Sequence, residues 1–109
     1  MKARRHTLAV FGVPAIVAHE LFYGAFRGSR PAQNLASFDA LMFEVVAFDK
    51  EDARQAAEIR AMLATAGTPI GPYDVLIAGQ ARARDLTLIT RNMGEFSRVD
   101  GLRAENWET

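Results

Sequence analysis

Hydrophobic positions along the 109 residues repeat with helical spacing in four stretches. The clearest of them covers residues 49–67, where apolar side chains recur every three or four positions. Asp49 suits the N-cap of this helix, and Gly67 suits the residue just past its end. Pro14 and Pro72 suit first helical positions. The pattern therefore predicts helices over residues 14–26, 33–42, 49–67 and 72–85.

Short runs of β-branched and aromatic residues between these stretches predict strands at 43–48 and 86–90, with a turn and an edge strand over 99–107. Strands separated by helices need crossover connections, so we expect an α/β domain with a mostly parallel sheet flanked by helices. Such sheets place their sites at the carboxyl ends of the strands. Here that rule points to residues 90–95, which follow the strand LTLIT.

Composition supports one globular domain over residues 1–109, because 50% of the residues are hydrophobic and 24% are charged. The absence of cysteine excludes disulfides, thiolate nucleophiles and cysteine zinc sites, and favours a cytoplasmic location. We expect no signal peptide and no membrane span. The formal net charge is zero, but residues 1–30 carry five Lys and Arg against one Glu. This local excess favours contact with a phosphate backbone, although solvated surface arginines explain it equally well.

Three acidic residues lie in apolar or tightly turned surroundings: Glu20, Asp74 and Glu95. An ionised carboxylate in such a place has to be paired, hydrogen-bonded or bound to a cation. If the three converge, a hard divalent ion such as Mg²⁺ or Mn²⁺ relieves their repulsion. An ion held in this way polarises phosphoryl oxygens and activates water, which is the chemistry of phosphodiester hydrolysis.

Each acid also has a local explanation. Asp74 falls in the first turn of a predicted helix, where it stabilises the helix dipole. Glu20 is suited to a salt bridge between helices, and Glu95 to capping a turn. The aromatic residues Phe22, Tyr23, Phe26, Phe38 and Phe43 recur at helical spacing, which favours packing in a core or dimer interface over stacking with bases.

Two segments together resemble PIN domains of the VapC type, the toxins of type II toxin–antitoxin pairs. VPAIVAHELFYGAF is similar to the family's first acidic region, in which a helix carries E-l-x-y-G. GTPIGPYDVLIAGQARARDLTLITRNMGEFSRVDGLRAENW is similar to its C-terminal half, with P-I-G-x-x-D, N-x-x-[DE]-F and G-L-x-x-E-x-W. The resemblance runs from about Val13 to Trp107, and the combined motifs are specific.

The resemblance implies a three-layer α/β PIN-like fold with an acidic pocket that binds Mg²⁺ or Mn²⁺. It implies an endoribonuclease that hydrolyses RNA, dimerises with a second copy and is inhibited by a VapB-type antitoxin. Glu20, Asp74 and Glu95 are expected to hold the metal, and Asn92 completes the catalytic set. Thr90, Arg91 and Asn92, on the opposite wall of the pocket, are expected to bind substrate.

One motif of the family does not occur in the sequence, namely the strand ending in L-D-T-N, whose Asp is a principal metal ligand. We therefore expect the first strand of the sheet to be missing or to be supplied by another chain, for example in a segment-swapped homodimer. Fewer charges would then hold the ion.

Two alternatives remain open from the sequence. One is a catalytically weak interaction module that binds antitoxin or dimerises without turning over RNA. The other is a flavodoxin-like signalling domain that is phosphorylated on Asp74, although no lysine stands near a strand end to support it.

Overall fold

The structure is a computed structural model that describes residues 12–41 and 44–106. Phe43 and Trp107, for which the sequence predicts positions in the core or at its edge, lie outside the described residues. In chain order the elements are β1 (Gly12–Pro14), α1 (Ala15–Arg27), α2 (Pro31–Asp39), β2 (Glu44–Val46), α3 (Lys50–Ala66), α4 (Pro72–Ala83), β3 (Thr87–Ile89), α5 (Met93–Phe96) and β4 (Arg103–Glu105).

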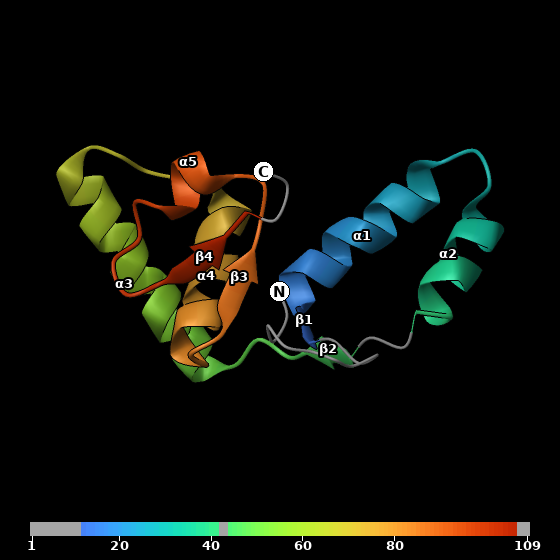
Figure 1. The fold of residues 1–109 in the computed structure, drawn as a ribbon, viewed down its shortest axis with the longest axis horizontal. Coiled ribbons are helices and arrows are strands. Elements are labelled where there is room, and N and C mark those ends of the chain that lie inside the picture. Colours follow the sequence, from blue (N-terminus) through green and yellow to red (C-terminus); the bar gives the residue numbers. More distant parts are fainter. Residues whose placement is uncertain (1–11, 42–43, 107–109) are drawn as a thin grey trace.

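The strands form two parallel pairs, β1 with β2 and β3 with β4 (Figure 1). The predicted parallel pairing is confirmed, but each pair is a separate sheet, and no described strand lies between them. Helices α1 and α2 accompany the first pair, whereas α3, α4 and α5 surround the second (Figure 1). The expectation that another chain supplies a strand between the pairs stays a prediction.

Helix α3 has the boundaries that its caps predict. The Asp49 side chain accepts a hydrogen bond from the Asp52 N–H at 3.1 Å, and the Asp52 carboxylate accepts one from the Asp49 N–H at 2.9 Å. This reciprocal pair satisfies two of the N–H groups that the start of a helix leaves open. Gly67 ends the helix with a φ of 76°, a left-handed conformation that glycine adopts without strain.

We call the β1–β2 pair with α1 and α2 the first unit, and the β3–β4 pair with α3, α4 and α5 the second unit. The core of the second unit lies where α3 and α4 cross, under the β3–β4 pair. Gly79 of α4 faces Ala56 of α3 so closely that a Cβ at position 79 would lie 2.5 Å from the Ala56 Cβ. Because the two helices approach each other this closely, the large side chains on either side of the contact pack into one shared core. The buried apolar cluster consists of Ile59, Leu63, Val75, Ile77, Ala78, Ala81, Leu88, Phe96 and Val99.

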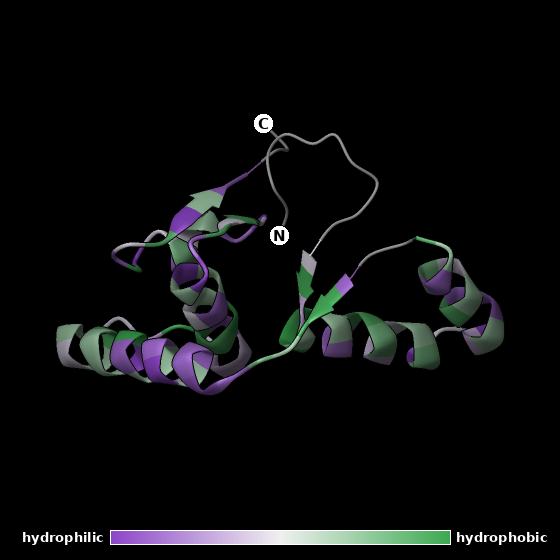
Figure 2. Ribbon diagram, turned by 90° about the horizontal axis from the view of Figure 1, so that it is seen from below, coloured by the Kyte–Doolittle hydropathy of each residue, from purple (hydrophilic) through white to green (hydrophobic). Residues whose placement is uncertain are grey.

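Outside this core, hydrophobic residues dominate the strands β1 and β2 (Figure 2). Val45 of β2 is nevertheless exposed, as expected for a two-stranded sheet that is too small to bury both of its faces.

Gln80 of α4 and Arg84, the residue that follows this helix, bind the segment that leads from β2 into α3. The Nε2 of Gln80, a residue with no exposed surface, donates to the carbonyl oxygens of Val46 and Ala47, both at 3.0 Å. The Arg84 Nη2 donates to the Ala47 carbonyl at 2.8 Å and to the buried Asp52 carboxylate at 2.9 Å. These bonds link the β1–β2 unit to the β3–β4 unit.

Among the helices in the described part of the chain, none combines the length and the apolar character needed to cross a membrane.

Candidate acidic site

The two closest acids of the candidate site come from neighbouring elements of the second unit. Asp74 lies in the first turn of α4, and Glu95 lies in the short helix α5. The backbone N–H of Gly71, just before α4, donates to Glu95 Oε1 at 3.2 Å. A Cβ placed on Gly71 would lie 3.1 Å from Asp74 Oδ2 and 3.8 Å from Glu95 Oε1, so both carboxylates approach the same point.

The pKa values of Asp74 and Glu95 are shifted in opposite directions. Partial burial, a hydrogen bond to Glu95 and the negative charges of Glu95 and Glu20 raise the pKa of Asp74 to about 6. The same hydrogen bond from Asp74, followed by the one from the Gly71 N–H, lowers the pKa of Glu95. Below about pH 6 the pair therefore carries one proton, held mainly by Asp74, and above this pH both carboxylates are ionised.

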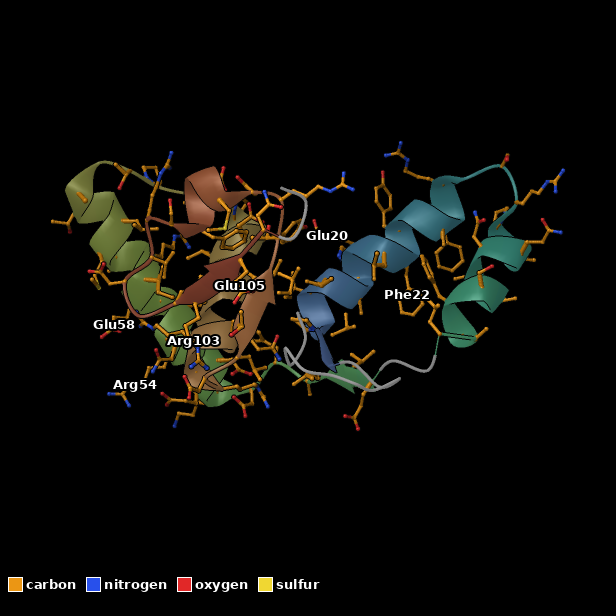
Figure 3. The ribbon with its side chains drawn as sticks, viewed as in Figure 1. Glu20, Phe22, Arg54, Glu58, Arg103 and Glu105 are labelled. Carbon is orange, nitrogen blue, oxygen red and sulfur yellow. The ribbon has the colours of Figure 1, made fainter. Side chains whose placement is uncertain are left out.

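Glu20 faces the pair from the first unit. Glu20 is an exposed residue of α1, on the side of this helix that faces the second unit (Figure 3). Its charge contributes to the raised pKa of Asp74, so the two carboxylates are electrostatically coupled. Glu20 also borders a groove of about 340 Å³ between α1 and α2, whose other wall includes Asn34 and Phe38.

The turn after β3 brings Asn92 to the pair, as the sequence predicts. A hydrogen bond from the Asn92 side chain contributes to the lowered pKa of Glu95. The Asn92 N–H donates to Thr90 Oγ1 at 2.9 Å, and the Thr90 N–H donates to the Glu105 carbonyl at 2.9 Å. Thr90 therefore holds the turn in shape, while Arg91 lies exposed at its outer side.

Two contributors to the site escape sequence analysis. Gly71 supplies the N–H that holds Glu95, and Arg98 donates to the Pro69 carbonyl at 3.0 Å while its charge helps to lower the pKa of Glu95. The sequence signals for Gly71 are its place in the P-I-G-x-x-D motif and its position before Pro72, which marks a helix start, but neither indicates a bond to Glu95. The sequence contains no signal for Arg98.

The pair of carboxylates fits part of a divalent-ion site. Oxygen ligands are those that Mg²⁺ and Mn²⁺ prefer, and Mg²⁺ commonly uses one or two carboxylates together with water. In residues 12–41 and 44–106, no group of three or more acidic, histidine or cysteine side chains is arranged to hold an ion by itself. The predicted set of three metal-binding acids therefore stays a prediction.

The raised pKa of Asp74 makes the free energy of unfolding depend on pH. Because folding raises the pKa of Asp74 from 3.8 to about 6, the stabilisation that its proton provides is complete below the lower value and lost as the pH rises through the higher one. We expect Asp74→Asn to raise the melting temperature at about pH 7.5, with the gain shrinking as the pH falls from about 6 to about 4 and absent below that. Differential scanning fluorimetry without added metal measures this difference, and an equal gain at both pH values would contradict it.

A family model and a curated relative place the chain among known proteins. The PIN domain model matches residues 2–102. The tRNA(fMet)-specific endonuclease VapC of Salmonella typhimurium is 42% identical over 97 residues, which are 87% of this chain and 74% of the relative. This chain is a PIN domain of the VapC family. Ribonuclease VapC2 of Haemophilus influenzae is 36% identical over the same share of both chains.

Solved structures of the VapC family confirm the predicted PIN-like α/β fold. The crystal structure of DNA-bound VapBC from Salmonella typhimurium matches with a TM-score of 0.83 at 42% identity, over 88% of this chain and 74% of that one. VapBC2 from Rickettsia felis, bound to a DNA fragment from its promoter, matches with a TM-score of 0.84 at 34% identity, over 89% and 74% of the two chains.

Proposed function

We propose that this chain is a Mg²⁺- or Mn²⁺-dependent endoribonuclease of the VapC type. The observation that carries the proposal is the approach of the Asp74 and Glu95 carboxylates to one point beside Gly71, where their negative charges favour a cation. Glu20 adds negative charge at the same place. The names of the relatives, a tRNA(fMet)-specific endonuclease and a ribonuclease, support RNA as the substrate.

Asp74 and Glu95 would hold the ion, with Glu20 completing its negative surroundings. When bound, the ion supplies an electrophile for a phosphoryl oxygen and lowers the pKa of water. The hydrolysis adds hydroxide to phosphorus and a proton to the leaving oxygen. Asp74 has to release its proton before it can serve as an anionic ligand, which favours activity above about pH 6.

The remaining residues of the site orient these groups and the substrate. The Gly71 N–H fixes one oxygen of Glu95, and the Asn92 side chain binds the same carboxylate. Thr90 shapes the turn through the Asn92 N–H. We assign Asn92 to the catalytic set, and Thr90, Arg91 and Asn92 to one wall of the substrate site.

We also propose a VapB-type antitoxin and a second copy of the chain as partners. Several solved structures that match this chain are VapBC assemblies. Within the described residues the β1–β2 and β3–β4 sheets remain separate, which leaves strand edges available for an added strand, whether from a swapped copy or from another segment.

The proposed activity is tested with metal and RNA together. We expect cleavage of a labelled tRNA in millimolar Mn²⁺ or Mg²⁺, loss of cleavage in excess EDTA, and recovery when the metal is restored. Isothermal titration with Mn²⁺ in the absence of RNA should show saturable binding with a dissociation constant of about 1 mM or tighter, corresponding to about −4 kcal/mol. Cleavage that persists unchanged in EDTA would refute the metal-dependent mechanism.

A second candidate function is an interaction module that binds antitoxin or dimerises without cutting RNA. It is favoured by the finding that the described residues contain no complete group of three metal-binding side chains. In that case neither saturable Mn²⁺ binding nor RNA cleavage should be observed with the purified chain.

A further inference from the structure

An exposed face of α1 carries four side chains that the acidic site does not use. His19, Tyr23, Phe26 and Arg27 are spaced i, i+4, i+7 and i+8, which places them along one side of a helix. Tyr23 is 59% exposed and Phe26 is 61% exposed. These two rings are therefore not core residues of the single chain, and their place in a dimer interface stays a prediction, whereas Phe22 and Phe38 do pack together between α1 and α2, with ring centroids 6.2 Å apart.

This row of side chains continues to the acidic site. The ring of His19 meets the ring of Tyr73 edge to face, with centroids 6.0 Å apart. Tyr73 is half exposed and precedes Asp74 in α4, while Glu20 follows His19 in α1. We call Tyr73, His19, Tyr23 and Phe26 the aromatic strip. It begins beside the acids and runs outward along α1, the helix that projects away from the second unit (Figure 3).

We propose that the aromatic strip stacks the bases of single-stranded RNA and guides the strand to the Asp74–Glu95 pair. This inference rests on the proposed function, because it concerns the substrate of the same site. Base stacking on exposed aromatic rings needs no particular sequence, since every base has a π face. The strip would therefore bind an unpaired segment of the substrate beside the scissile phosphate.

The charge on this face suits a phosphate backbone. The Arg27 guanidinium lies over the Tyr23 ring, 5.5 Å from its centroid, so a cation accompanies the most accessible part of the strip. A phosphate that follows a base stacked on Tyr23 would meet this cation, which combines ring stacking with backbone attraction as in single-strand binding sites.

The spacing of the rings also suits separate bases. Neighbouring rings of the strip on α1 are four or three residues apart, a rise of about 6 or 4.5 Å, which exceeds the roughly 3.4 Å between stacked bases in one strand. Successive rings of the strip can therefore take successive unstacked bases. Glu20 lies one turn from Tyr23 on the adjoining side of α1, so a strand held on the rings passes next to this acid.

Binding of a labelled single-stranded oligoribonucleotide, followed by fluorescence anisotropy, tests the inference. The full chain with Asp74→Asn is the background, so that bound RNA is not cut. We expect Tyr23→Leu and Phe26→Leu each to raise the dissociation constant about five- to a hundredfold, and Tyr23→Phe to change it little because the ring remains. Arg27→Ala should reduce the slope of log K against log salt by about one.

An abasic oligonucleotide separates stacking from indirect damage. Replacing the base that contacts Tyr23 by an abasic site should weaken binding as much as Tyr23→Leu, and the two changes together should cost no more than either alone. Met62→Ala, which removes an exposed apolar side chain from α3, is the matched control and should leave binding unchanged.

Two results would overturn the inference. One is RNA binding by Tyr23→Leu and Phe26→Leu equal to that of the background chain. The other is unchanged RNA binding with weakened self-association in sedimentation, which would assign the strip to a protein contact. In both cases the unmodified chain still cuts RNA and the proposed function stands. A chain that neither cuts nor binds RNA refutes both proposals.

Discussion

Asp74→Asn and Glu20→Gln should each lower the rate of metal-dependent RNA cleavage by more than about a hundredfold. Removing a residue that only hydrogen-bonds to a metal ligand typically lowers activity by about ten- to a hundredfold, so a larger loss indicates a direct role at the ion. The pKa of Asp74 is raised by partial burial and by the negative charges of Glu95 and Glu20 close to it. A bound cation would neutralise the charge of Asp74. Glu20 supplies the third negative charge at the same place. Initial rates on a labelled tRNA in Mn²⁺ measure the effect.

Two controls make this result specific. Asp39→Asn removes an exposed acid at the end of α2 and should leave the rate unchanged. The far-ultraviolet circular dichroism of Asp74→Asn should match that of the parent, and its melting temperature at neutral pH should be higher. An inactive variant that is also more stable cannot owe its inactivity to unfolding. Parent-like cleavage by both site variants would refute the assigned roles of Asp74 and Glu20.

Gly79→Ala should be the most destabilising single-methyl change in the described core. The added Cβ would lie 2.5 Å from the Ala56 Cβ and 2.6 Å from two of the Ala56 backbone atoms, so α3 and α4 have to move apart. Overpacking of this kind costs about 1–3 kcal/mol or more. For a domain of this size, that corresponds to a fall in melting temperature of about 5–20 °C.

Gly24→Ala is the matched control for this prediction. Gly24 lies within α1, and a Cβ at this position would meet no atom within 4 Å. Because glycine inside a helix is less favourable than alanine by about 0.5–1 kcal/mol, this variant should be slightly more stable than the parent. Chemical denaturation of the two variants beside the parent measures both effects. Equal stability of the Gly79→Ala variant and the parent would show that the close contact between α3 and α4 is not strictly required.

The sequence predicts those features that local chemistry decides. The start and end of α3 follow from Asp49 and Gly67, and the structure confirms both. The parallel direction of the strands follows from the helical connections between them. The rule that sites lie at the carboxyl ends of parallel strands points to residues 90–95, whereas the place of Asp74 beside Glu95 is implied only by the resemblance to the PIN family.

Features that depend on long-range packing could not be predicted in the same way. Helical spacing shows that Phe22 and Tyr23 lie on a helix, but not which of them α2 covers. The Gly71 N–H becomes a partner of Glu95 only because α5 folds back over the start of α4. The separation of the sheets depends on which strands become neighbours in space, whereas the hydrophobic pattern describes each strand alone.

The bonds from Gln80 to the Val46 and Ala47 carbonyls have a mechanical consequence for the acidic site. Glu20 belongs to one half of the molecule, and Asp74 and Glu95 belong to the other, so the spacing between these acids depends on the contacts that join the halves. Besides the Gln80 bonds, these contacts include the bond from Arg84 to the Ala47 carbonyl and the ring contact of His19 with Tyr73. A substitution that weakens the Gln80 bonds is therefore expected to change the affinity for a cation that all three acids attract, although Gln80 itself lies outside the acidic site.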